Sequence, residues 1–346
     1  MSRIPRWTFV LAALLALTIP LALWAPLALM AQDEIEVPTI KIGVTEVVVP
    51  VTVTDSEDRF VSNLKQSDFE VYDQNIRQTL KFFTAEHNQP VVVGFLMDLS
   101  NGMKVRWKEY HETAVEMVLS LLTGDKKFQG YLIGYSTQAE VMVDTTFDAD
   151  KIVSKLDKVT PAGGAALYDA IYLACTSRKL VPGEPVEPRR VLVIVGDGHD
   201  NASSHTLEEV IELAQRTQLT IYAISTDAYG FTSPYGKNLR RLAEETGGRV
   251  ETPLENTYDN TQGFLSRPSD EGAFEFKVGT GGFQAKILGS MFKSITNIAG
   301  EITTQYLLRY QPNTPGDESL RHEIKVHVNL ANTKVRARSF YYVANP

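Results

Sequence analysis

The chain has 346 residues, of which 43% are hydrophobic and 22% charged, values that are ordinary for a globular protein long enough to hold two domains. Its 42 acidic residues outnumber the 34 basic ones, which gives a formal net charge of −8. Nucleic-acid binding relies on a basic surface that neutralises phosphates, so this balance excludes nucleic acid as the expected partner. The only cysteine, Cys175, permits no intrachain disulfide.

The first 31 residues have the pattern of an export signal. Arg3 and Arg6 precede an almost uncharged apolar segment from Trp7 to Ala31, and the sequence then turns sharply polar. We expect cleavage after Ala31 and an exported protein, located in the periplasm, in the cell envelope or outside the cell. The apolar segment is also long enough to span a bilayer, so an uncleaved anchor stays open as the alternative, and only then would the chain contact a membrane.

Short β patterns flank the central region at both ends. Near the N-terminus, residues 46–54, 68–73 and 78–83 are expected strands, and Pro50 favours an edge position for the first of them. Near the C-terminus, residues 306–310, 324–328 and 334–343 are expected strands. Neither end can build a core by itself, so we expect the N-terminal segment, residues 44–88, to pair with the C-terminal segment, residues 302–346, in one small β module.

Between these segments, residues 89–301 alternate between strand and helix patterns. This alternation predicts an α/β fold with a doubly wound, mostly parallel sheet of the Rossmann-like kind. The expected strands are residues 91–98, 128–135, 140–145, 191–196 and 219–225, and the expected helices are residues 104–122, 148–156, 167–178, 206–217, 238–245 and 284–299. Residues 254–282 are rich in Gly, Asn, Thr, Ser and Asp, which predicts a long surface insertion.

Two of the apolar strand patterns run directly into polar residues. The first ends at Asp98, with Ser100 two residues later, and the second is followed at once by Asp197. Ligands of open α/β sheets bind at the carboxyl ends of the strands. If these two strands are neighbours, their loops bring the three side chains together. Hard oxygen ligands without a thiolate suit magnesium or calcium rather than zinc.

With these motifs the chain resembles the von Willebrand factor type A domain and, from about residue 44 to the C-terminus, the exported VWFA-related proteins described from acidobacteria. That family has a metal-ion-dependent adhesion site made of an Asp-x-Ser-x-Ser loop, a Thr in a Gly-Gly-Thr-like loop and an Asp in a Thr-Asp-Gly-like loop. By position, Asp98, Ser100 and Asp197 match. Gly102 replaces the second Ser and Ala165 replaces the Thr, so the resemblance implies a degenerate site without two of its hydroxyl ligands.

We therefore expect the site to bind Mg²⁺ or another divalent cation weakly or not at all, because water can replace the hydroxyls but fewer ligands are fixed in advance. Asn101 and Asp200 are candidate auxiliary oxygen donors; the alternative for each is to cap its own turn. Asp98 by itself could simply cap the following helix. The presence of Asp197 at the end of the second strand favours a metal-type pocket over simple capping, since the carboxylates of Asp98 and Asp197 would repel each other unless a cation or a proton lay between them.

The expected function is that of an exported module that binds a protein partner, without enzymatic activity. The resemblance implies that a bound metal completes its coordination with a carboxylate of the partner, and that the last helix shifts to change affinity. The predicted partner surface centres on the strand-end loops, with the residues Gly102, Met103, Gly164, Ala165 and His199. Two alternatives stay open: a metal-assisted hydrolase that uses the same loops, and a structural envelope protein whose site has decayed. The hydrolase is disfavoured because no nucleophile, oriented base and oxyanion donor form a coherent set.

Overall fold

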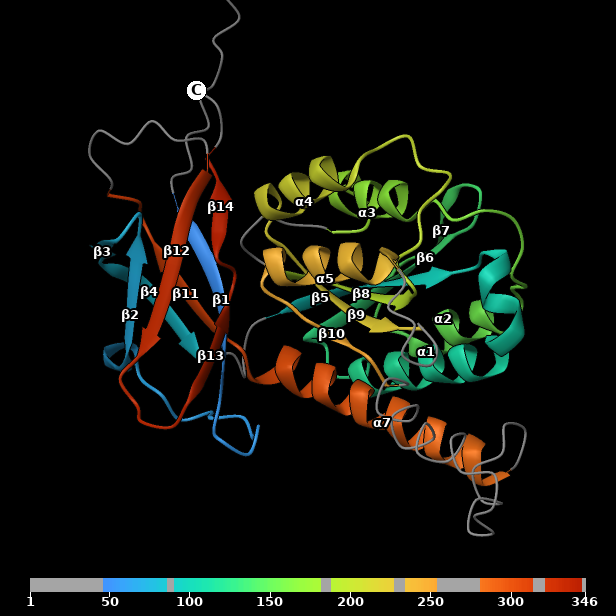
Figure 1. The fold of residues 1–346 in the computed structure, drawn as a ribbon, viewed down its shortest axis with the longest axis horizontal. Coiled ribbons are helices and arrows are strands. Elements are labelled where there is room, and N and C mark those ends of the chain that lie inside the picture. The colour runs from blue at the N-terminus through green and yellow to red at the C-terminus, as the bar shows by residue number, and fades with distance from the viewer. Residues whose placement is uncertain are drawn as a thin grey trace, which may run out of the picture. The chain divides into compact units, whose positions relative to one another are not determined.

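The middle of the main sheet consists of strands that are buried on both faces. All residues of β5 (Val91–Asp98) and β9 (Leu219–Ser225), and all but one of β8 (Arg189–Gly196), are buried. Parallel strands covered by helices on both sides show this pattern because neither face meets water. The computed structural model describes residues 46–85, 90–181, 188–226, 234–253, 281–313 and 321–343 (Figure 1).

The strand order of this sheet is β10-β9-β8-β5-β6-β7, where β6 is Phe128–Tyr135, β7 is Ala139–Thr146 and β10 is Val250–Glu251. Neighbouring strands are parallel except for the antiparallel pair of β6 and β7. The predicted doubly wound, mostly parallel fold is thereby confirmed.

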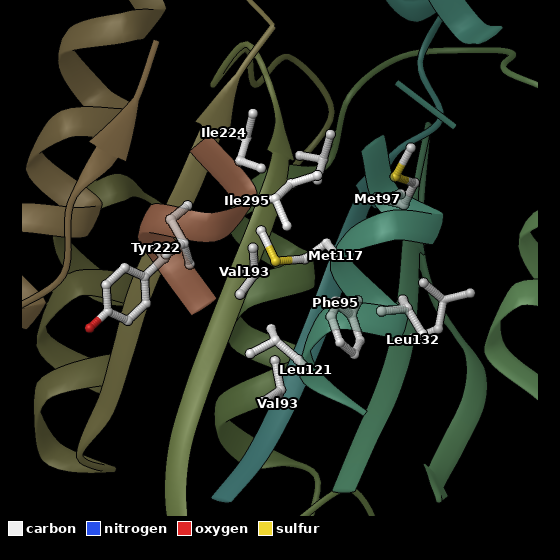
Figure 2. Close-up of a cluster of buried hydrophobic side chains, with 14 of the residues drawn as sticks. Val93, Phe95, Met97, Met117, Leu121, Leu132, Val193, Tyr222, Ile224 and Ile295 are labelled. Atoms are coloured by element: carbon white, nitrogen blue, oxygen red, sulfur yellow. The ribbon is translucent and has the colours of Figure 1, made fainter. Parts of the chain in front are cut away.

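Helices cover both faces of the sheet. One face packs against α1 (Trp107–Leu121), α2 (Ala149–Leu156) and α7 (Gly281–Thr304), and Figure 2 shows Met117 and Leu121 of α1 near the strand residues Val93 and Phe95. The other face packs against α3 (Leu167–Thr176), α4 (Leu207–Arg216) and α5 (Pro234–Thr246). The helix predicted at residues 104–122 begins instead with a 3₁₀ helix, Asn101–Arg106, that leads into α1.

Strands from the two ends of the described chain share two further sheets, both antiparallel. The first has the order β13-β1-β11-β4 and the second the order β14-β12-β2-β3. The N-terminal strands are β1 (Val47–Thr54), β2 (Phe69–Asp73), β3 (Ile76–Gln78) and β4 (Leu80–Ala85), with a 3₁₀ helix (Gln66–Asp68) before β2; the C-terminal strands are β11 (Tyr306–Tyr310), β12 (Arg321–Val328), β13 (Lys334–Ala337) and β14 (Phe340–Tyr342). Their buried side chains form one core cluster, which makes these eight strands the β module.

Three predicted features of this module are wrong in detail. Pro50 does not mark an edge strand, since β1 lies between β11 and β13; it precedes Val51, the first residue that pairs with β13, so no ladder on that side needs its missing N–H. The strand predicted at residues 78–83 is divided between β3 and β4. The strand predicted at residues 334–343 is interrupted at Arg338 and Ser339, where the chain crosses from one sheet to the other.

A buried carboxylate connects the end of α7 to the β module. The Thr52 hydroxyl donates to Glu301 Oε1 at 2.9 Å, Arg249 Nε lies 3.3 Å from Glu301 Oε2, and Arg336 forms a further ion pair with the same oxygen. The Glu301 side chain is fully buried. These contacts hold the last turn of α7 against β1 and β13 within the compact unit formed by residues Ile42–Pro346.

The predicted leader, residues 1–31, lies outside the described residues, as do residues 254–280 of the predicted insertion. Among the helices that the structure describes, none is long and apolar enough to cross a membrane.

Candidate functional site

Asp98 and Asp197 stand at the carboxyl ends of two neighbouring parallel strands. Asp98 is the last residue of β5, Asp197 follows the last residue of β8, and the register pairs Met97 with Val195. The two strands are therefore neighbours, as a site shared by their loops requires. Gly196 directly precedes Asp197, and a Cβ there would be only 3.3 Å from Asp98 Oδ2. The close approach of the two loops therefore needs a glycine.

Each carboxylate uses one oxygen to hold its own loop. The backbone N–H of Ser100 donates to Asp98 Oδ1 at 2.8 Å, and the backbone N–H of His199 donates to Asp197 Oδ1, also at 2.8 Å. Asp98 Oδ2 is buried and has no cationic partner among the described residues, although hydrogen bonding from the Ser100 and Tyr135 side chains supports the carboxylate. Because a buried anionic oxygen without a balancing charge is costly, this atom is the strongest sign that the site takes a ligand.

Burial raises the pKa of Asp98 to about 6, and the Asp197 carboxylate adds to the rise, although hydrogen bonds from Ser100 oppose it. The carboxylate is therefore mostly ionised at neutral pH, in a place that favours its neutral form. A cation next to Asp98 Oδ2 would relieve this unfavourable situation. The electrostatics of the site thus favour either a proton or a metal ion.

Tyr135 is a site residue that the sequence analysis did not identify. It is the last residue of β6, it pairs in register with Asp98, and it is fully buried. Burial, followed by the charge of Asp98, raises its pKa well above the ordinary value, so its hydroxyl stays protonated. A Cβ on Gly196 would lie 2.5 Å from this hydroxyl, which shows how near it is to the two carboxylates. Its place at the end of the predicted strand 128–135 was the available signal.

The loop that lacks the expected threonine is held at the site by asparagine and backbone groups. The backbone N–H of Asn101 donates to the carbonyl of Gly163 at 3.1 Å. The backbone N–H of Ala165 donates to Asn201 Oδ1 at 2.8 Å, and the backbone N–H of Asn201 returns a bond of 2.9 Å to the Ala165 carbonyl. Asn201 was not among the site residues expected from the sequence. In the structure it ties the Gly163–Gly164 loop to the loop after Asp197.

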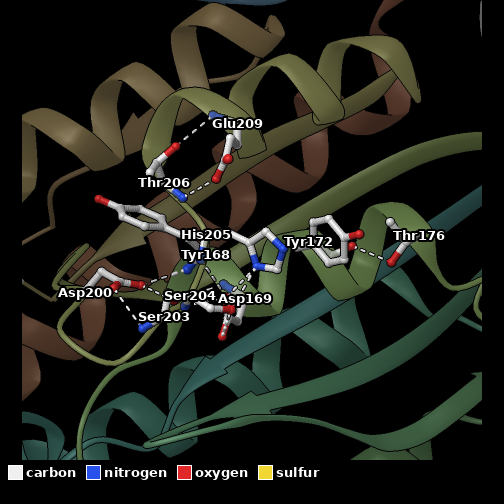
Figure 3. Close-up of polar contacts among 10 residues, drawn as sticks. All are labelled: Tyr168, Asp169, Tyr172, Thr176, Asp200, Ser203, Ser204, His205, Thr206 and Glu209. Atoms are coloured by element: carbon white, nitrogen blue, oxygen red, sulfur yellow. Dashed lines mark hydrogen bonds and ion pairs between the residues drawn. The ribbon is translucent and has the colours of Figure 1, made fainter.

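Asp200 caps the start of α3. Its Oδ2 accepts hydrogen bonds from the Tyr168 backbone at 2.9 Å and from the Ser203 hydroxyl, as Figure 3 shows. Next to it, Asp169 Oδ1 lies 2.6 Å from His205 Nδ1 and accepts from the backbone of Ser204 at 3.0 Å. Asp200 thus makes the contacts expected of the capping alternative. The Asn101 side chain is exposed and makes no capping hydrogen bond to the described residues.

The structure places two of the predicted partner-binding residues in the core. Met103 and Ala165 are each 2% exposed, Met103 in the core with α1 and Ala165 in the core with α3. Gly102 is exposed and Gly164 and His199 are partly exposed. The surface available to a partner at these loops therefore centres on these three positions.

His199 is not arranged as a catalytic base. Its ring stacks on Tyr235 with 4.2 Å between the ring centroids, and its backbone supports Asp197. In the described chain, no hydroxyl of a serine is hydrogen-bonded to the His199 ring. These contacts explain the residue as a support for the loop.

The donors that the site offers to a cation are Asp98 Oδ2, the Asp197 carboxylate and the Ser100 hydroxyl, which makes no capping bond. All are hard oxygen atoms of the type that magnesium and calcium prefer. Within the described ranges there is no cluster of three or more His, Cys, Asp or Glu side chains suited to a metal. The residues therefore fit a divalent cation, but with few protein ligands.

Comparison with known proteins agrees with this architecture. The family model of the von Willebrand factor type A domain matches residues 93–262, which span the main sheet from β5 to β10. The strand order and the paired strand-end carboxylates agree with this match, and the segment has the fold of a von Willebrand factor type A domain. No curated protein matches the chain.

Solved structures resemble the chain at low identity. An aerotolerance-related membrane protein from Bacteroides fragilis is 17% identical, over 51% of this chain and 97% of that one, with a TM-score of 0.38. Proximal thread matrix protein 1 from the mussel byssus, with a zinc-occupied MIDAS motif, is 14% identical over 67% of this chain and 50% of that one, with a TM-score of 0.44. The type V pili tip protein Mfa5 from Porphyromonas gingivalis is 14% identical over 51% and 95%, with a TM-score of 0.39.

Proposed function

We propose that the chain is an exported protein-binding module that contacts its partner through the strand-end loops, and that its metal-ion-dependent adhesion site is degenerate. The match of residues 93–262 to the von Willebrand factor type A domain supports an interaction module. The observation that carries the proposal is the buried Asp98 Oδ2 at the meeting point of these loops, which has no cationic partner among the described residues. As part of the proposal, the chain is one of the exported VWFA-related proteins of the acidobacterial type.

The weakness of the cation site follows from its ligands. Gly102 and Ala165 carry no hydroxyl, and the side chains of Asn201 and Asp200 are used to hold loops. When bound, a divalent cation would neutralise the two carboxylates and offer a coordination position to a carboxylate of the partner. Asp98, Asp197 and Ser100 would hold it. With so few fixed ligands, affinity is low and the surrounding loop surface supplies more of the specificity.

The proposal includes no catalytic role. The site brings oxygen donors together, but its histidine supports a loop and its tyrosine is a buried, neutral hydroxyl. A hydrolase would need an activated nucleophile with an oriented base beside it. Phosphoesterase or peptidase turnover by the purified protein that disappears in folded Asp197→Ala would contradict this part of the proposal.

Restoring one hydroxyl tests the degenerate site. A Cβ on Gly102 would meet only Ser100 Oγ, at 3.6 Å, so Gly102→Ser fits without strain. We expect this change to increase Mg²⁺ affinity several-fold in calorimetry, because it adds a preorganised ligand. The double change with Ala165→Thr should increase it further, and Asp98→Ala should abolish binding.

The matched control is Gly289→Ser on α7, where a Cβ would meet nothing within 4 Å. This control should leave Mg²⁺ binding unchanged. Tight Mg²⁺ binding by the unmodified protein would contradict the degenerate site, and an unchanged affinity in folded Gly102→Ser would contradict the assignment of the ligands.

A further inference from the structure

A polar cavity lies at the end of the main sheet opposite the strand-end site. It is formed where β8 and β9 begin, against β1, β11 and the link between β13 and β14. Its volume is about 20 Å³, and its wall includes three arginines, Arg189, Arg190 and Arg338, and no acidic residue. A space of this size holds one species little larger than a water molecule.

Arg338 is the residue that gives this cavity its chemistry. It lies in the link between β13 and β14 and is only 5% exposed. Among the described residues no carboxylate forms an ion pair with it, and its Nε has no hydrogen-bond partner. The centroid of the Tyr341 ring lies 5.9 Å from its guanidinium carbon. Burial lowers its pKa to about 10, so the guanidinium is still charged at neutral pH.

The backbone fixes Arg338 at this place. Gly247 approaches it so closely that a Cβ on Gly247 would lie 3.3 Å from the Arg338 backbone nitrogen, and the φ of Gly247, +91°, is in the region that favours glycine. The backbone of Arg338 is therefore held against the turn after α5. A buried charge held in this way needs a compensating partner.

We infer that this cavity binds one small monovalent anion of the halide class, such as chloride, between the von Willebrand factor type A domain and the β module. The anion compensates the Arg338 guanidinium, whose charge favours an anion over water in this cavity. The volume excludes nucleotides and sugar phosphates. The bound anion therefore stabilises the contact between β8, β9 and the β module, independently of the strand-end site.

Thermal unfolding in chloride and in gluconate at constant ionic strength tests this inference, since gluconate is too large for the cavity. The unmodified protein should melt about 2–4 °C higher in saturating chloride. Arg338→Met should lose this difference, and Arg338→Lys should keep part of it because the charge remains. Arg240→Met, at an exposed position on α5, is the matched control and should keep all of it.

Direct detection uses crystals of the unmodified protein grown in bromide. A bromide anomalous peak beside Arg338 is expected. The inference is overturned if the cavity shows no such peak, or if Arg338→Met responds to chloride as the unmodified protein does. Should Arg338→Met fail to fold, the bromide experiment and Arg338→Lys still decide the matter.

Discussion

Replacing Asp98 by Asn should make the protein more stable at alkaline pH, which is unusual for a change in a functional site. Asn keeps the oxygen that accepts the Ser100 backbone bond, and it removes the charge from the buried second oxygen. Its amide group also matches the neutral form of Asp98 that the surroundings favour. The expected stabilisation is the cost of keeping the Asp98 carboxylate ionised in the folded protein.

The size of the effect follows from the pKa of Asp98, which rises from 3.8 to about 6 on folding. Since the folded pKa is the higher one, the penalty is absent below pH 3.8, grows as the pH rises towards 6, and is complete above it. A shift of roughly 2 units corresponds to about 3 kcal/mol above pH 7. We therefore expect the gain in unfolding free energy at pH 8 to exceed the gain at pH 4.5 by about 2 kcal/mol.

Urea unfolding at the two pH values, in the presence of a chelator, measures this difference. The control is Asp144→Asn, which removes the same charge from an exposed position on β7 and should change stability little at either pH. Adding Mg²⁺ should then stabilise the unmodified protein and not Asp98→Asn. If Asp98→Asn destabilises the protein at pH 8, or changes stability equally at both pH values, the reasoning about the unrelieved carboxylate is refuted.

Glu301→Ala should lower the unfolding free energy by about 2 kcal/mol, because it removes the fully buried carboxylate that pairs with the partly exposed Arg336 and Arg249 and accepts from Thr52. Glu212→Ala at an exposed ion pair should cost less than about 1 kcal/mol, and equal urea midpoints for the two variants would contradict this. Deleting residues 302–346 should speed hydrogen exchange in residues 46–85, since β1, β2 and β4 lose their partner strands, and unchanged exchange there would show that the two ends are independent. N-terminal sequencing of the exported protein should begin at Gln32, and an intact Met1 in a membrane fraction would show an anchor.

Continuous apolar runs made most of the main sheet predictable. The strands at residues 128–135 and 219–225 match β6 and β9, because strands buried on both faces leave an unmistakable pattern. The β module was less predictable, since its strands pair across more than 200 residues of chain and the last predicted strand is divided at Arg338. No glycine or proline marks the break within residues 334–343, so only the tertiary structure reveals the change of sheet.

The site was predictable where strand ends determine it and not where loops meet. Asp98 and Asp197 follow from the rule that ligands bind at the carboxyl ends of parallel strands. Asn201 was missed because its bond to the backbone of Ala165 joins residues 36 positions apart, which no spacing indicates. Met103 was taken for a loop residue at the surface, but the 3₁₀ helix turns it into the core.

Site-specific photo-crosslinking tests the central claim, that the strand-end loops bind a protein partner, most directly. A photoreactive amino acid would replace Asn101, which is exposed beside the site, or Lys126, which is exposed before β6 at the opposite end of the sheet. In the cells that produce the protein, the account predicts a discrete protein adduct from position 101 and none from position 126. The same adduct from both positions, or no protein adduct from position 101 with the protein folded, would contradict it.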